Sequence, residues 1–232
     1  MTLPTPTIIA HRALLFGPDR RAENTLAAIS AAVAERFPVE LDITIDVHGD
    51  RLVLSHDIAE WSAEREPRSM LAVPAPPSPH LLNVKDLCAL PAILHLLELH
   101  EARERFTLFD FELAAGGDRG VPYLMRSLQD RGFTVAHRVS EREPYAHRYA
   151  ADPAVTTIWL DEFEPRTLRE DDVRRLVDAG KRCLYVSPDL HRRETPEALR
   201  ARWAELLAWG VDGICTDFPV ALRSTLEGLT VA

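Results

Sequence analysis

The sequence is poor in cysteine and has no long apolar run. Its 232 residues include three cysteines, Cys88, Cys183 and Cys215, without any paired spacing. This count argues against a disulfide framework and against a structural zinc site, and it favours reduced, buried thiols. No apolar run approaches the roughly 18 residues of a membrane-spanning helix, and the first residues lack the features of a signal peptide. We therefore expect a cytoplasmic protein without a stable membrane anchor.

An excess of positive charge is also missing. Lysine and arginine total 27 against 36 aspartate and glutamate residues, which gives a formal net charge of −9 with histidine neutral. Such a chain is poorly suited to bind nucleic acid or an anionic membrane as its main partner. Apolar residues make up 46% and charged residues 27%, which is typical of a globular chain and not of a disordered one.

Eight β-rich segments alternate with stretches of helical periodicity. Short, nearly continuous apolar strands separated by helices are typical of parallel βα units. Eight such units predict an α/β fold, a single (β/α)8 barrel that occupies residues 1–232 as one domain. The rival, a doubly wound open sheet, lacks its glycine-rich phosphate loop after the first strand. The expected strands are Thr7–Arg12, Pro38–Ile45, His80–Lys85, Phe106–Glu112, Thr134–Ser140, Val155–Phe163, Arg182–Leu190 and Val211–Asp217.

Residues with known preferences for helix ends mark several boundaries. Asn24 is expected to cap a helix that begins near Leu26. Thr195-Pro196 is expected to start a helix, and Gly180 and Gly210 are each expected to end one. These boundaries agree with the strand assignments on either side of them.

Two insertions follow the second expected strand. Arg51–Asp57 is predicted to be a further strand, joined to Pro38–Ile45 by a hairpin turn at residues 48–50. Residues 58–79 then lack periodicity and contain five prolines. A long loop in a compact domain is usually functional or mobile. We interpret this segment either as a loop that covers a substrate or as a solvated decoration.

Polar side chains gather at the carboxyl ends of the expected strands, where the active sites of barrels lie. In three strands the polar residues are spaced two apart and therefore share one face. The apolar residues between them suit the outward face beneath the helices, so we expect the polar set to point inward. The three pairs are Glu40 with Asp42, Asn83 with Lys85, and Asp110 with Glu112.

Converging carboxylates cannot all stay ionised without a cation close by. A set of oxygen ligands without cysteine suits one divalent cation, Mg²⁺ or Ca²⁺. The alternative is a network of salt bridges in which Arg12, Lys85 and Arg138 neutralise the carboxylates. His11 and His56 end adjacent strands beside charged residues, which makes them candidates for proton transfer.

Several of these residues occur in a recognisable order: His11-Arg12, Glu23-Asn24-Thr25, Glu40-Leu41-Asp42 and His56-Asp57. This order resembles the signature of the glycerophosphodiester phosphodiesterase family, and the segment Gly210–Pro219 is similar to that family's final strand. The resemblance spans nearly the whole chain. It implies a (β/α)8 barrel, in agreement with the eight βα units.

The resemblance also implies a chemistry, because members of that family cleave phosphodiesters with one divalent cation and two histidines. It implies metal-dependent hydrolysis of a small anionic, glycerophosphodiester-like substrate. By match to the family, His11 and His56 would be the acid–base pair, and Glu40 and Asp42 would bind the metal. Arg12 would contact the phosphate, and Glu23 would bind either the metal or a hydroxyl group of the substrate.

The chain departs from the family's pattern in three places. Ala13 replaces the usual glycine and is followed by an insertion, Leu14–Arg21. The family's Glu-x-Lys aligns best with Asn83-Val84-Lys85, so Asn83 stands at a metal-binding position and Lys85 is kept. Asn83 could bind the cation through its amide oxygen. Otherwise Asp110 or Glu112 supplies the missing carboxylate, and an alternative alignment puts Glu112 on the family's glutamate.

The third departure concerns the substrate pocket. The family's Trp-Thr motif on the seventh strand is replaced by Tyr185–His191, so we expect the pocket to have diverged. The expected pocket residues at the other strand ends are His137, Arg138 and Asp161. Two alternatives stay open: cleavage by attack of a substrate hydroxyl that leaves a cyclic phosphate, and a degenerate barrel that binds a phosphorylated ligand without turnover.

Overall fold

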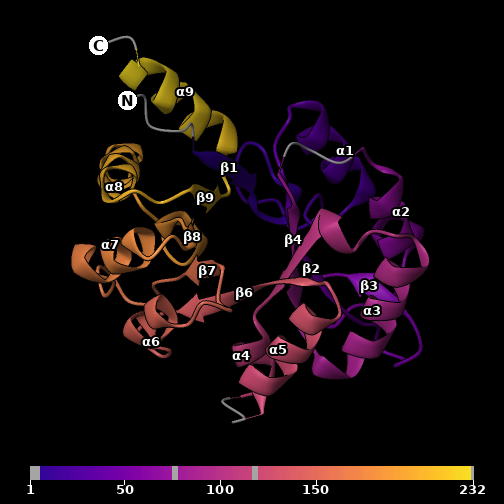
Figure 1. The fold of residues 1–232 in the computed structure, drawn as a ribbon. Coiled ribbons are helices and arrows are strands. Elements are labelled where there is room, and N and C mark those ends of the chain that lie inside the picture. Colours follow the sequence, from indigo (N-terminus) through magenta and orange to yellow (C-terminus); the bar gives the residue numbers. More distant parts are fainter. Residues whose placement is uncertain (1–5, 75–77, 117–119, 231–232) are drawn as a thin grey trace. The chain divides into compact units, whose positions relative to one another are not determined.

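The computed structural model describes residues 6–74, 78–116 and 120–230 (Figure 1). The chain forms two compact units: Ala10–Val135, and Met1–Ile9 together with Ala136–Ala232. Within each unit, strands alternate with helices and pair in parallel apart from one hairpin. The fold class is therefore the α/β class expected from the sequence, with the strand–helix alternation of a (β/α)8 barrel and a β-hairpin inserted after the second strand.

The unit Ala10–Val135 contains a sheet ordered β5-β4-β2-β3. β2 pairs in parallel with β4, β4 pairs in parallel with β5, and β3 returns antiparallel to β2. This antiparallel pair confirms the predicted hairpin. The strands are β2 (Glu40–Ile45), β3 (Leu52–Leu54), β4 (His80–Val84) and β5 (Phe106–Phe109), and the α-helices are α1 (Leu26–Ala34), α2 (Pro67–Ala72), α3 (Leu90–Leu99), α4 (Phe111–Ala114) and α5 (Val121–Asp130).

The other unit contains the parallel order β1-β9-β8-β7-β6. Its core joins the strands to helices α7 and α8 through large side chains such as Tyr185 and Trp203. The strands are β1 (Thr7–Ala10), β6 (Thr134–Val139), β7 (Thr157–Leu160), β8 (Arg182–Val186) and β9 (Gly213–Thr216), and the helices are α6 (Ala146–Ala151), α7 (Glu170–Asp178), α8 (Pro196–Trp209) and α9 (Pro219–Thr230). β1 and β6 each cross the boundary between the units along the chain.

Three details of the sequence prediction are wrong. The helix cap is Thr25, whose hydroxyl accepts from the amide of Ala28, and Asn24 bonds elsewhere. Residues 58–79 are not uniformly irregular, because a 3₁₀ turn and α2 form there; Pro67 occupies the first turn of α2, where proline is favoured. Residues 75–77 of that segment lie outside the described residues. The strand expected over 106–112 ends at Phe109, because Asp110 takes a left-handed conformation and α4 follows.

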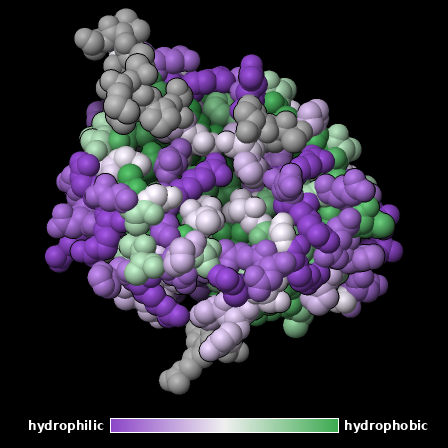
Figure 2. All heavy atoms as spheres, in the orientation of Figure 1, coloured by the Kyte–Doolittle hydropathy of each residue, from purple (hydrophilic) through white to green (hydrophobic). Residues whose placement is uncertain are grey.

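The exterior is mixed. On the face drawn in Figure 2, hydrophilic side chains predominate and the apolar areas between them are small. Among the helices that the structure describes, none has both the length and the apolar character needed to cross a bilayer.

His80 at the start of β4 couples folding to pH. Its side chain is 1% exposed, and its Nδ1 accepts from the amide of Val39 at 3.1 Å. Burial, followed by the positive charge of Arg105, lowers the pKa of His80 from 6.5 to about 4. The unfolded chain therefore binds this proton first as the pH falls. Stability from His80 is complete above pH 6.5 and is lost between pH 6.5 and 4.

We expect His80→Asn to weaken this pH dependence, because asparagine keeps an acceptor for the amide of Val39 but does not titrate. Between pH 7.5 and 4.5 the native chain should lose about 2.5 kcal/mol more free energy of unfolding than the variant. Urea denaturation at both pH values measures the difference. Parallel losses in the two proteins would show that His80 is not the titrating group.

Candidate active site

Arg12 connects three acidic side chains in the unit Ala10–Val135. Its backbone amide donates to Oε2 of Glu40 at 3.1 Å, and its Nη1 donates to Oε2 of Glu23 at 2.9 Å. Its Nε lies 3.2 Å from Oδ2 of Asp42. The Arg12 side chain is 20% exposed, so the guanidinium keeps some access to solvent while neutralising these carboxylates. The residues that the sequence placed together at the start of the chain and on β2 do meet.

Asp42 is held from three directions. The amide of Asn24 donates from Nδ2 to Oδ2 of Asp42 at 3.0 Å, and Oδ1 of Asn24 accepts from the backbone amide of Asp42 at 3.0 Å. The ammonium of Lys85 lies 3.7 Å from Oδ1 of Asp42. Asp42 is paired with Asn83 in the β2–β4 register, which explains how Lys85, two residues further on, reaches the same carboxylate. The predicted shared face of Asn83 and Lys85 agrees with this geometry.

Glu40 has the most perturbed acidity in the cluster. Burial, followed by the charge of Asp42, raises its pKa from 4.5 to about 7, against the opposing effects of His11 and Arg12. The Nε2 atom of His11 lies 3.9 Å from Oε2 of Glu40. Glu40 is therefore only partly ionised near neutral pH.

The backbone is strained at the same place. Arg12, Ala13 and Asn24 have φ values of 50°, 63° and 58°, and Asp110 at the end of β5 has a φ of 69°. Left-handed conformations cost non-glycine residues roughly 1–2 kcal/mol and cluster at functional sites. Ala13 thus occupies a conformation that glycine adopts at lower cost. Arg12 and Ala13 belong to a short 3₁₀ turn after β1, which is why His11 lies beyond the strand end.

His56 lies on the loop after β3. Its Nδ1 is 2.9 Å from Oδ1 of Asp57, and its side chain is 38% exposed. The hydrogen bond with His56 lowers the pKa of Asp57, and the charges of Arg12 and Arg20 contribute to the same direction. The loop that carries His56 therefore lies within electrostatic range of Arg12.

The oxygen atoms at β2 and β4 suit a hard cation. Within the described residues, no three His, Cys, Asp or Glu side chains are placed to hold one metal ion. A cation at Glu40 and Asp42 would accordingly need a neutral oxygen ligand. Asn83 offers one, because its Oδ1 is buried with no hydrogen-bond partner among the described residues, and Asn83 is paired with Asp42 in the β2–β4 register. The donor set fits Mg²⁺ or Ca²⁺.

Asp110 and Glu112 differ from the sequence prediction. They do not share a strand face, because Asp110 follows the last residue of β5 and Glu112 lies in the first turn of α4. Asp110 is 5% exposed at the carboxyl end of β5. The role of either residue as a metal ligand stays a prediction.

The remaining predicted residues, His137, Arg138 and Asp161, belong to the other unit, and their side chains lie on opposite faces of its strands. Arg138 forms a buried ion pair with Asp161, and Nε2 of His191 lies 2.6 Å from the other oxygen of Asp161. His137 packs its ring 5.0 Å from that of Tyr149 on α6, and burial lowers its pKa to about 4. Because neighbouring residues on a strand point to opposite faces, Arg138 and His137 cannot line the same surface. The geometry favours Arg138 over His137 as a group that meets a substrate.

Sequence reasoning missed two partners. Asn24 was expected to cap a helix, and His191 was named only as the end of the diverged segment Tyr185–His191. A signal existed for each: Asn24 belongs to the Glu-Asn-Thr signature, and His191 closely follows the end of β8.

No family model matches the chain, and no curated protein matches it in sequence.

Solved structures do match. The chain is similar to a candidate glycerophosphodiester phosphodiesterase from Galdieria sulphuraria, with a TM-score of 0.72 and 16% identity over 98% of this chain and 100% of that one. It is similar to a glycerophosphoryl diester phosphodiesterase from Parabacteroides distasonis, with a TM-score of 0.72 and 14% identity over 97% of this chain and 87% of that one. A candidate glycerophosphoryl diester phosphodiesterase from Silicibacter pomeroyi gives a TM-score of 0.66 and 16% identity over 97% and 94%. The chain therefore shares the fold of these three proteins along nearly its whole length.

Proposed function

We propose that the protein hydrolyses a small, anionic, glycerophosphodiester-like phosphodiester and is a divergent member of the glycerophosphodiester phosphodiesterase family. The observation that carries the proposal is the cluster of Arg12, Glu23, Glu40 and Asp42, with His11 beside it and strained backbone around it. The three similar solved structures support the proposal through their shared fold.

One divalent cation, Mg²⁺ or Ca²⁺, is part of the proposal. Glu40, Asp42 and the amide oxygen of Asn83 would hold it. When bound, such a cation supplies positive charge that stabilises the phosphoryl oxygens. It would also relieve the repulsion between Glu40 and Asp42 that raises the pKa of Glu40.

The chain's own groups bind the phosphate and move the protons. Arg12 and Lys85 offer their positive charges to the phosphoryl oxygens, for which they would exchange part of their contact with Asp42. Either His11 or His56 accepts a proton from the attacking water while the oxygen of that water forms a bond to phosphorus. The other donates a proton to the leaving alkoxide as the old phosphorus–oxygen bond breaks. Water and diester thus give an alcohol and a phosphomonoester.

Arg138 and Asp161, which pair within their own unit at the carboxyl ends of β6 and β7, stay proposed substrate-binding residues, whereas the contacts of His137 suit packing beneath α6. Replacement of the family's Trp-Thr motif by Tyr185–His191 supports a substrate that differs from simple glycerol diesters.

An assay with and without chelator tests the function. Glycerophosphocholine and bis-(p-nitrophenyl) phosphate are incubated with Mg²⁺, Mn²⁺ or Ca²⁺, and the products are followed by phosphorus NMR. We expect hydrolysis that a chelator abolishes and that added cation restores. Activity that survives the chelator would contradict the metal, and a persistent cyclic phosphate would favour attack by a substrate hydroxyl.

The alternative of a barrel that binds a phosphorylated ligand without turnover is tested by metal binding, because Asn83 stands in place of a charged metal ligand. Calorimetric titration with Mg²⁺ and Ca²⁺ is expected to show binding to the native chain and weaker binding to Asp42→Asn. No binding at millimolar concentration, together with no turnover of either diester, would favour a barrel that only binds its ligand.

A further inference from the structure

Helix α3 is apolar on two faces. Its first face packs into the core through Ile93, Leu94 and Leu97. A second stripe has the spacing i, i+3, i+4 and i+7 and consists of the apolar residues Ala92, Leu96 and Leu99 together with the polar residue His95. A helix with apolar residues all round is normally covered on all sides. Leu99 is nevertheless 61% exposed, so the second stripe is only partly covered by the protein.

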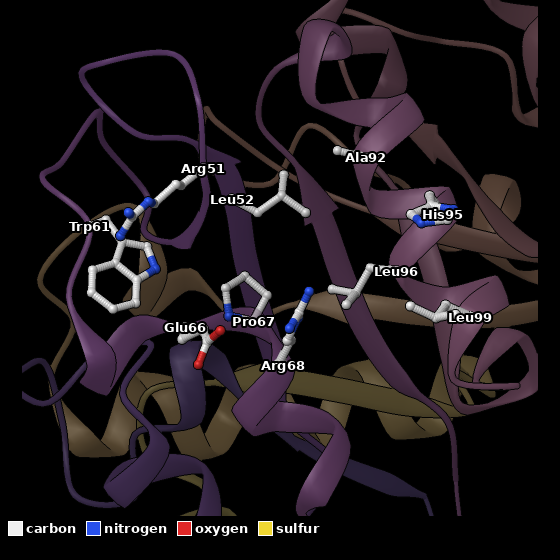
Figure 3. A pocket seen from close by; sticks show the side chains of 10 residues that line it. All are labelled: Arg51, Leu52, Trp61, Glu66, Pro67, Arg68, Ala92, His95, Leu96 and Leu99. Carbon is white, nitrogen blue, oxygen red and sulfur yellow. The ribbon is translucent and has the colours of Figure 1, made fainter.

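The second stripe forms one wall of a cavity of about 360 Å³ in the unit Ala10–Val135. Leu52 at the start of β3 and Pro67 in the first turn of α2 form the facing walls, and Trp61 closes one side (Figure 3). This volume lies within the range of about 300–1,000 Å³ that small-molecule sites occupy. None of the residues proposed for catalysis lines this cavity.

Two arginines give the apolar cavity a positive edge. Arg51 lies with its guanidinium carbon 4.9 Å from the ring centre of Trp61, and Arg68 extends between Pro67 and Leu96 (Figure 3). Both arginines are exposed. In the part of the chain that the structure describes, neither guanidinium has an ion-pair partner, although Glu66 also lines the cavity. A local positive charge on a chain of net charge −9 indicates a ligand that carries negative charge.

We propose that this cavity binds a monomeric amphipathic anion, represented by a medium-chain alkyl carboxylate. The chain of the ligand packs against Leu52, Leu96 and Leu99, and its carboxylate lies between Arg51 and Arg68. Burial of the alkyl chain supplies most of the affinity, so binding should strengthen about fourfold with each buried methylene. The two guanidinium groups set the preference for an anion. The site is independent of the proposed phosphodiesterase activity.

Decanoate below its micelle concentration is the probe, and calorimetry and tryptophan fluorescence report its binding. We expect saturable binding with one molecule per chain. Butyrate, which keeps the carboxylate but lacks most of the chain, should bind at least tenfold more weakly. Decyltrimethylammonium, which keeps the chain but reverses the charge, should also bind at least tenfold more weakly. Trp61→Phe should remove the change in fluorescence without removing the heat of binding.

Variants test each part of the cavity. Arg51→Gln and Arg68→Gln should each weaken decanoate binding by about two- to fivefold, the range for charge pairs that are partly exposed. Ala92→Trp should fill the cavity and abolish binding. Arg126→Gln on α5 is the matched control, because that exposed arginine pairs with Asp130 on its own helix and lies outside the cavity, and it should change nothing. Thermal unfolding of each variant checks that the fold is retained.

Three results would overturn the proposal: equal binding of decanoate and decyltrimethylammonium, undiminished binding by the variant that lacks both Arg51 and Arg68, or undiminished binding by a folded Ala92→Trp. Binding to anionic lipid vesicles without saturable binding of monomeric decanoate would also overturn it and would assign the arginines to a membrane surface. Because hydrolysis of diesters is not part of the readout, failure of the proposed enzymatic function leaves this test intact.

Discussion

His11→Gln is expected to lower kcat/KM for a phosphodiester by about 10²–10⁴-fold, the usual contribution of one positioned acid or base. The imidazole lies 3.9 Å from Glu40 and is 14% exposed, so it is close to the cluster yet open to a substrate. Glutamine has a similar volume and can still form hydrogen bonds, but it cannot transfer a proton at neutral pH. The measurement is a steady-state rate at saturating cation.

His56→Gln should give a comparable loss, and the double variant should lose much less than the product of the two, because residues that act in one step are not additive. His100→Gln is the control, since His100 is an exposed residue at the end of α3. A bell-shaped pH–rate profile should become one-sided when either histidine is removed. Native activity in both single variants would exclude the pair from the chemistry.

The βα alternation could be predicted because each parallel strand is covered on both faces and therefore consists of consecutive apolar residues. In β4, for example, every residue is buried. Helix ends were predictable where one residue decides them: Gly210 ends α8 with a φ of 91°, and Thr195 caps its start. These signals are local, so they survive in a single sequence.

Contacts between distant residues could not be predicted in the same way. Asn24 is of a residue type that often caps helices, but its side chain forms a hydrogen bond with Asp42, 18 residues away. Thr25 caps the helix instead. Asp110 ends an apparently regular strand by taking a positive φ. A positive φ at a residue other than glycine cannot be predicted from the residue type. Pro67 is read as a breaker although it begins α2.

The candidate site shows the same division. The two-residue spacing of Glu40 and Asp42 predicted a shared face, and the β2–β4 register then brings Asn83 level with Asp42. The pairing of Arg12 with both Glu23 and Asp42 depends on the strained turn after β1, for which no pattern in the sequence gives a signal. Spacing along one strand was predictable, whereas the turns between elements were not.

Neighbouring residues at the end of β7 illustrate how opposite faces acquire different roles. Asp161 pairs with Arg138 and His191, whereas Glu162 points towards α8 and pairs there with Arg202 at 2.9 Å. The hydroxyl of Tyr185 donates to the same oxygen of Glu162 and accepts from Arg202. The side chains of Arg202 and Glu162 are 6% and 2% exposed. This pair is therefore a structural element beneath a helix.

Arg202→Met is expected to reduce the free energy of unfolding by about 3–5 kcal/mol, because it leaves the buried charge of Glu162 without its cation. Arg200→Met on the same helix is the matched control. Its partner Glu197 is 76% exposed, so the loss should stay within about 1 kcal/mol. Urea denaturation at pH 7.5 measures both.

The double variant Arg202→Met with Glu162→Gln separates lost attraction from stranded charge. Glutamine removes the uncompensated charge and keeps an oxygen that can accept from the amide of Leu168, as Glu162 does at 2.9 Å. If the cost of Arg202→Met is mainly the desolvation of an unpaired carboxylate, the double variant should be more stable than Arg202→Met alone. Equal stability of these two variants would instead assign the loss to the packing of the arginine side chain against Trp209, whose ring centre lies 4.6 Å from the guanidinium carbon.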